Sequence, residues 1–334
     1  FDIKKNFNRI KNSKDGRTLV ANFGYLSLLQ IAGYIFPLIT LPYLARVIGV
    51  DGFGKIAFAT AVIVWFQTVA DWGFNYTATR DVAKNRENKE KVSQIFSNVF
   101  WARCLLTVLS FFLLILLILI IPKFGEMSLL LIITFLMIPG HILFPDWFFQ
   151  AVEKMKFITI LNLISKLLFT LAVFIFIDKK SDFILQPLFI SLGYVASGVI
   201  AMYYILVKWK IKLHMPNFKD VILTIKSSTD VFINNLMPNL YNSFSTFLLG
   251  VFGGAISTGK LDAGGKFVGI AQQFISVISR TFYPYLSRKI GKHNFFVGIN
   301  ITISLFISII LFVFAPLLID LFFTSDFHDS IIVL

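Results

Sequence analysis

Residues 105–121 read LLTVLSFFLLILLILII, an apolar run that contains no charged side chain. The hydrocarbon core of a bilayer is about 30 Å thick, and a helix that crosses it needs roughly 17 to 25 predominantly apolar residues. Residues 19–44 and 301–319 have the same character. Because such runs recur along the whole chain, the sequence predicts an all-α polytopic membrane protein.

The composition separates this chain from soluble proteins. Of 334 residues, 57% are hydrophobic and only 15% are charged, whereas roughly 25% of the residues in a soluble domain are charged. The formal net charge of +13 does not indicate a nucleic-acid partner, because the cations lie in short segments between apolar runs. One cysteine and four scattered histidines predict neither a disulfide framework nor a metal site, and we expect no cofactor.

Nine membrane spans can be placed on the sequence. They cover residues 18–43, 56–77, 97–121, 127–150, 157–177, 184–207, 227–250, 261–284 and 296–319. A further apolar run begins at residues 331–334, so we expect the chain to be truncated within a longer protein.

The segments between the spans alternate in charge. Those that precede spans one, three, five, seven and nine carry about three times as many Lys and Arg residues as the others. Short segments rich in Lys and Arg stay on the cytoplasmic side of a membrane. We therefore expect the N-terminus, a basic stretch over residues 1–17, to be cytoplasmic.

An internal repeat emerges when the second half of the chain is laid on the first with an offset of 205 residues. Gly54-Lys55 then falls on Gly259-Lys260, and Gln30, Tyr34 and Pro37 fall on Asn235, Asn239 and Asn242. Because both halves begin on the same side, this pattern predicts a parallel repeat of six spans. The predicted lobes are residues 18–207 and a partial second lobe over 227–334, joined by a cytoplasmic linker over 208–226.

A polar stripe follows the seventh span. Asn235, Asn239, Asn242 and Thr246 share one helical face, which must meet either a water-filled cavity or another helix that these groups bridge. The first span has a matching stripe that includes Gln30 and Tyr34, and this match favours the cavity.

Ionisable groups inside spans are costly and need a reason to be there. Lys166 lies at the middle of the fifth span, Arg103 and Arg280 lie nearer the cytoplasmic side, and Arg46 lies just past the first span. The predominance of cations suits an anionic ligand such as a phosphate. The alternatives are that Arg103 and Arg280 extend to the membrane surface and that Lys166 pairs with Asp71.

The fourth span combines a helix-breaking Pro139-Gly140 pair with Asp146. A broken helix beside a carboxylate can form a substrate or ion site. The favoured interpretation is instead that this segment is an interfacial anchor, with Trp147 in the aromatic belt of the membrane. The glycine-rich segment 49–54 lacks the spacing of a phosphate-binding loop. No set of side chains suggests catalysis, so an enzyme is not expected.

The first hundred residues resemble a known family. NFGY at 22–25, PLITLPYLARVIG at 37–49, GFGKIAFA at 52–59 and DWGFNYTATRDVA at 71–83 are similar to bacterial O-antigen and polysaccharide flippases of the Wzx type. These flippases belong to the multidrug/oligosaccharidyl-lipid/polysaccharide exporter superfamily. The resemblance is looser after Lys208.

This resemblance implies a transporter of the bacterial inner membrane, with twelve helices in two lobes about a central cavity. Its substrate would be an undecaprenyl-pyrophosphate-linked oligosaccharide, and its partners other membrane proteins of polysaccharide assembly. By motif, Arg46 and Arg80 would hold the anionic head group; Lys166 and Arg280 join them by their placement.

We therefore expect a flippase that works by alternating access. One alternative is a cation-coupled multidrug exporter of the same fold, for which Asp71 is the candidate ion-coupling carboxylate of the first lobe. A membrane polysaccharide polymerase is less favoured, because its catalytic groups would need a large outer loop and every predicted outer loop is short.

Overall fold

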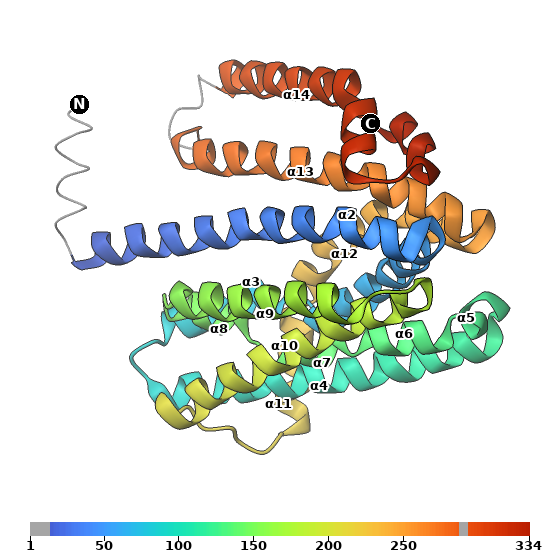
Figure 1. The fold of residues 1–334 in the computed structure, drawn as a ribbon. Coiled ribbons are helices and arrows are strands. Elements are labelled where there is room, and N and C mark those ends of the chain that lie inside the picture. Colours follow the sequence, from blue (N-terminus) through green and yellow to red (C-terminus); the bar gives the residue numbers. More distant parts are fainter. Residues whose placement is uncertain (1–13, 287–292) are drawn as a thin grey trace.

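The computed structural model describes residues 14–286 and 293–334, and the regular elements within these ranges are helical (Figure 1). The α-helices are α2 (Lys14–Asp71), α3 (Phe74–Lys84), α4 (Lys89–Ile120), α5 (Pro122–Glu126), α6 (Ser128–Phe135), α7 (Met137–Leu143), α8 (Asp146–Ala151), α9 (Met155–Phe176), α10 (Leu185–Tyr203), α11 (Phe218–Ser227), α12 (Thr229–Leu248), α13 (Gly254–Leu286) and α14 (His293–Phe322). Short 3-10 or π-helical turns are η1 (Lys180–Ile184), η2 (Tyr204–Lys208), η3 (Leu249–Gly253) and η5 (Ser325–Val333).

Seven helical segments within the described ranges are long and apolar enough to cross a membrane. Two of them, Gly24–Lys84 with 61 residues and Thr229–Ile275 with 47 residues, have the length of two crossings each at about 20 residues per crossing. These two overlap the first, second, seventh and eighth predicted spans, and the other five each overlap one. The prediction of an all-α polytopic membrane protein is confirmed. The side on which the N-terminus lies and the boundaries of the lobes stay predictions.

Both of the long segments are interrupted at a glycine. Gly49 has φ 66° and ψ 179°, so α2 is in fact two helices that meet at a kink. Gly254, the first residue of α13 directly after η3, has φ 80° and ψ 173°. Only glycine adopts this backbone conformation without strain. The two glycines are 205 positions apart, which is the offset predicted for the repeat.

A second pair of glycines lets the two halves touch. A Cβ atom on Gly54 would collide with the carbonyl oxygen of Ala255 and lie 2.7 Å from the backbone nitrogen of Gly259. A Cβ atom on Gly259 would in turn collide with the carbonyl oxygen of Val50 and lie 3.1 Å from the backbone nitrogen of Gly54. Val50 and Ala255 also differ by 205 positions, so the contact is reciprocal, as a two-fold relation between repeats requires. This backbone contact between α2 and α13 supports the predicted offset.

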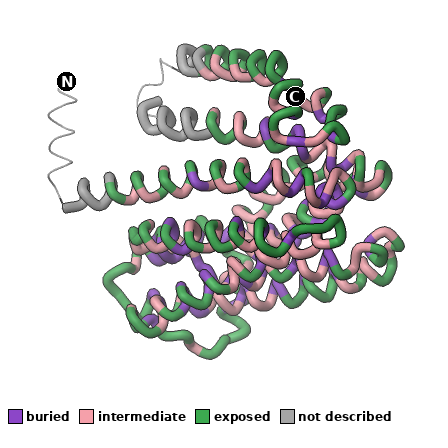
Figure 2. Tube along the Cα trace, viewed as in Figure 1, coloured by how far each residue is buried: buried purple, intermediate pink, exposed green. Residues whose placement is uncertain are grey.

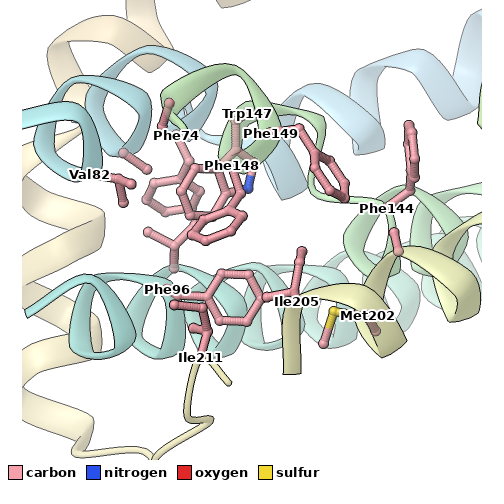
Figure 3. Packing of buried hydrophobic residues seen from close by; sticks show 14 of the residues in the cluster. Phe74, Val82, Phe96, Phe144, Trp147, Phe148, Phe149, Met202, Ile205 and Ile211 are labelled. Carbon is pink, nitrogen blue, oxygen red and sulfur yellow. The ribbon is translucent and has the colours of Figure 1, made fainter. Parts of the chain in front are cut away.

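Three apolar clusters hold the helices together. One joins α3, α4 and α8 through aromatic side chains (Figure 3), and a second joins the latter part of α2 to α4, α6 and α7. The third includes Leu44 and Phe53 of α2 together with Phe267 of α13 and Phe323 beyond α14, so it connects the two halves. Large apolar side chains such as Leu119 and Phe312 are exposed on outward faces, where a membrane protein meets lipid. Figure 2 shows this pattern as buried stretches on inner faces and exposed stretches outside.

The fourth predicted span is three short helices, α6, α7 and α8. The predicted break at Pro139-Gly140 is wrong, because both residues lie within α7. Pro139 is the third residue of that helix, where a backbone N–H has no helical partner and its loss costs nothing. The helices are interrupted instead at Leu136, between α6 and α7, and at Phe144 and Pro145, before α8.

Candidate functional site

A cavity of about 550 Å³ lies between the first part of α2, α9, α10 and α13. Helices from both halves of the chain line it. Its walls are largely apolar, and they carry a small set of polar side chains: Tyr34, Thr40, Asn162, Ser165, Lys166, Gln186, Tyr194, Asp262, Lys266 and Gln273. A mostly apolar cavity with a few polar groups is the usual form of a small-ligand site.

Lys166 of α9 projects across the cavity towards α2. Its Nζ atom lies 3.4 Å from the position that a Cβ atom on Gly33 would occupy, so the ammonium group reaches the bare backbone of the facing helix. Within the described part of the chain, none of the ion pairs or hydrogen bonds involves Lys166. The alternative that Lys166 pairs with Asp71 is wrong, because Asp71 pairs with Arg103.

The other charges of the cavity neutralise each other. Lys266 and Asp262, one turn apart on α13, form an ion pair with an N···O distance of 2.9 Å. The charge of Lys166 therefore remains uncompensated, and the cavity as a whole is cationic. It can hold an anionic group.

Of the polar stripe predicted on the first span, Tyr34 lines the cavity, and Gln30, one turn earlier, is hydrogen-bonded to it. The amide nitrogen of Gln30 donates to the hydroxyl of Tyr34 at 2.5 Å and to Oε1 of Gln273 at 3.4 Å. Tyr34 and Gln273 line the cavity. The bond to Gln273 links α2 to α13, and Gln273 is a polar residue that the sequence interpretation missed.

The stripe of the seventh span is placed differently. Asn239 donates to the hydroxyl of Thr68 at 3.0 Å, and Trp65 donates to Ser243 at 2.7 Å, so this part of α12 is bonded to the latter part of α2. The alternative of polar contacts between helices therefore holds for Asn239. Asn235, Asn242 and Thr246 are not among the residues that line the 550 Å³ cavity, and a role for them in a water-filled space stays a prediction.

The arginines named from the family motifs lie outside this cavity. Arg46 is exposed near the kink of α2. Arg80 is exposed on α3, and its Nε donates to Asp81 at 2.8 Å. The side chain of Arg280 lies outside the described residues. Of the four predicted head-group ligands, the structure therefore places Lys166 in the cavity.

Arg103 does not extend to the membrane surface, contrary to one interpretation above. Only 4% of its side chain is exposed, and it forms an ion pair with Asp71 across α4 and α2. Its Nε and Nη1 atoms are buried without a partner. His141 and Asp146 lie within electrostatic range of this pair. Asp71 is thus paired with Arg103 in this conformation, and its role in ion coupling stays a prediction.

Trp147 is not an interfacial anchor either, because only 1% of it is exposed. It lies in the aromatic cluster beside Phe96 and Phe148 (Figure 3). Its backbone nitrogen donates to Asp146 Oδ1 at 2.8 Å. The apparent interfacial motif is therefore part of the core. In residues 14–286 and 293–334, no group of three His, Cys, Asp or Glu side chains is arranged to hold a metal ion.

Comparisons with known proteins agree with a membrane role. A sequence model of the polysaccharide biosynthesis protein family matches residues 19–290. A proposed O-antigen transporter of Escherichia coli (strain K12) is 29% identical over 273 residues, which are 81% of this chain and 65% of that protein. A proposed O-antigen transporter of Shigella dysenteriae is 25% identical over 270 residues, 81% of this chain and 68% of that protein. The chain thus spans about two thirds of the length of these relatives. No solved structure matches it.

Proposed function

The chain belongs to the polysaccharide biosynthesis protein family, and on this premise we propose that it moves an undecaprenyl-pyrophosphate-linked oligosaccharide across the bacterial inner membrane. The family match confirms the resemblance predicted from the motifs at residues 22–83. The names of the two relatives support a transport role and an O-antigen unit as cargo. The proposed orientation has a cytoplasmic N-terminus.

The observation that carries this proposal is the uncompensated charge of Lys166 in a cavity lined by both halves of the chain. A pyrophosphate needs cationic donors once it leaves water, because an unpaired charge in a medium of low polarity is unstable. Lys166 supplies one such donor at the middle of its span. The neighbouring amide and hydroxyl groups of Asn162, Gln186 and Gln273 can hydrogen-bond sugar hydroxyls.

Lys166→Gln should lower the export of lipid-linked repeat units by about 10-fold or more, because a charge-assisted contact contributes roughly 1.5–3 kcal/mol. The variant of the complete protein is expressed in a strain that lacks the gene, and repeat units on the cytoplasmic leaflet are counted against protein abundance in the membrane.

Lys156→Gln is the matched control, since Lys156 is exposed on the same helix and does not line the cavity. It should export normally, and Lys166→Arg should retain most activity. Normal export by the Lys166→Gln variant would mean that Lys166 does not bind the head group. Periplasmic units that stay unpolymerised in the deletion strain would instead favour the polymerase alternative.

The reciprocal glycine contact suggests how access could alternate. Val50 to Gly54 of α2 cross Ala255 to Gly259 of α13 at backbone distance. We propose that the two halves rock about this crossing, so that the cavity opens first to one side of the membrane and then to the other. The lipid tail would remain in the bilayer throughout. Other membrane proteins of polysaccharide assembly remain predicted partners.

A further inference from the structure

A second pocket, of about 410 Å³, lies at one end of the helices and is separate from the 550 Å³ cavity. The segments that meet there are the connection from α3 to α4, the turn between α8 and α9, and the chain that follows η2. Each of these is an end of a membrane-crossing segment. In Figure 1 the connections lie together at the same end of the helices. The pocket is therefore at the boundary between membrane and water.

The floor of the pocket is apolar and tightly packed. Phe148 and Ile211 are buried and line it, and Figure 3 shows them within the aromatic cluster. The Trp209 ring closes the floor, with ring centroids 6.1 Å from Phe148 and 5.3 Å from Phe157. A tryptophan with one apolar face and one wet edge suits the interfacial region.

The rim of the pocket is charged. Arg86, Lys89 and Lys154 line it together with Glu87, and Arg86 also forms an ion pair of 3.1 Å with Glu153. Lys89 and Lys154 take part in none of the ion pairs within the described part of the chain. With both acids included, these five side chains leave one positive charge. One phosphodiester would balance it.

Two strained turns form the walls of this pocket. Glu153 and Lys210 both have φ 56°, a left-handed conformation that side-chain-bearing residues rarely adopt. Each lies between two pocket-lining residues, Val152 and Lys154 in one turn and Trp209 and Ile211 in the other. Strain of this kind persists where the surroundings hold the backbone, and it is concentrated at binding sites.

We propose that this pocket binds the head group of an anionic glycerophospholipid of the surrounding bilayer. Its position, its apolar floor and its rim of cations match a phosphate that carries acyl chains, and basic pockets between membrane helices bind lipid head groups in this way. The lipid phosphate contacts Lys89 and Lys154, and the glycerol backbone lies against Trp209. The site is independent of the proposed transport function.

Native mass spectrometry of the complete purified protein in detergent, titrated with phosphatidylglycerol, tests this site. Lys89→Gln combined with Lys154→Gln should weaken phosphatidylglycerol binding by about tenfold or more, because two charge-assisted contacts are lost. Phosphatidylethanolamine, which has no net charge, should bind the unaltered protein more weakly than phosphatidylglycerol does. Its binding should fall little in the double variant. The melting temperature without lipid should not change, since both lysines are exposed.

The matched control is Lys91→Gln combined with Lys156→Gln. Lys91 lies two positions after Lys89 in α4, and Lys156 lies two positions after Lys154, in the first turn of α9. Both are exposed and do not line the pocket. The control should bind phosphatidylglycerol like the unaltered protein. An equal loss of phosphatidylglycerol binding in both double variants would mean that the lipid is attracted by the positive charge of the surface in general, and this would overturn the proposal. Displacement of the lipid by an equal concentration of glycerol phosphate would also overturn it, because the site would then hold free phosphate.

Discussion

Asp71→Asn should destabilise the protein by roughly 3–5 kcal/mol, because it leaves the buried guanidinium of Arg103 without its counter-charge. Asp71 is the ion-pair partner of Arg103 within the described chain, and two of the guanidinium nitrogens already lack an acceptor. Thermal unfolding of the detergent-solubilised protein, followed by size-exclusion chromatography, measures the loss. The amount of folded protein in the membrane should fall in parallel.

The double variant Asp71→Asn with Arg103→Gln should recover much of this loss, because removal of both charges also removes the cost of burying them. Asp51→Asn is the control. It breaks a partly exposed ion pair of 2.6 Å with Lys55 one turn away, and i,i+4 helix pairs contribute roughly 0.3–0.5 kcal/mol. A similar small effect of Asp71→Asn would show that Arg103 reaches water or another acceptor.

The Asp71–Arg103 pair shows what sequence patterns leave undecided. Each residue could be located within its span from the lengths of the apolar runs, because the rise per residue of a helix is constant. Which helix each side chain faces depends on how the helices rotate and tilt against one another, and these follow from tertiary packing. Depth alone made Lys166 a possible partner for Asp71. The structure instead brings α4 against α2.

Trp147 shows the same limit. A tryptophan next to a carboxylate near a span end is typical of the membrane interface, yet the short helix α8 turns this residue into the aromatic cluster. The break at Phe144 that makes this possible has no signal beyond Pro145. By contrast, the positions of Lys166 and Tyr34 beside the cavity follow from depth and helical phase within a single regular helix.

The sequence matches behind the predicted repeat fall on glycines that the backbone geometry requires. The sequence offset aligned Gly54 with Gly259, and the structure explains the match through a backbone crossing that leaves no room for a side chain. Gly49 and Gly254 add a second aligned pair through their positive φ. Two aligned glycine pairs are few, but each is required by the backbone geometry at its position, so they are stronger evidence for the 205-residue offset than matches between replaceable residues.

Gly54→Ala should destabilise the protein by roughly 3 kcal/mol or more, at the upper end of the cost of overpacking, because the new methyl group meets backbone atoms of α13 that cannot rotate away. Gly259→Ala should have an effect of the same sign, since its Cβ meets the backbone at Val50 and Gly54. Thermal unfolding in detergent and export per folded molecule in cells measure stability and transport separately.

Gly24→Ala is the matched control, because Gly24 lies in α2, the helix that carries Gly54, does not line the 550 Å³ cavity and has nothing within 4 Å of its Cβ position. It should be neutral or stabilise the helix by roughly 0.5–1 kcal/mol, which makes the sign of the effect the decisive result. If Gly54 and Gly259 form one crossing, the second alanine should add little after the first has separated the helices. Additive losses would mean two independent contacts, and a benign Gly54→Ala would mean that the halves do not touch there. Either result would mean that the crossing does not act as the pivot of the two halves. A non-additive loss of stability, together with reduced export per folded molecule, would support the crossing as the pivot.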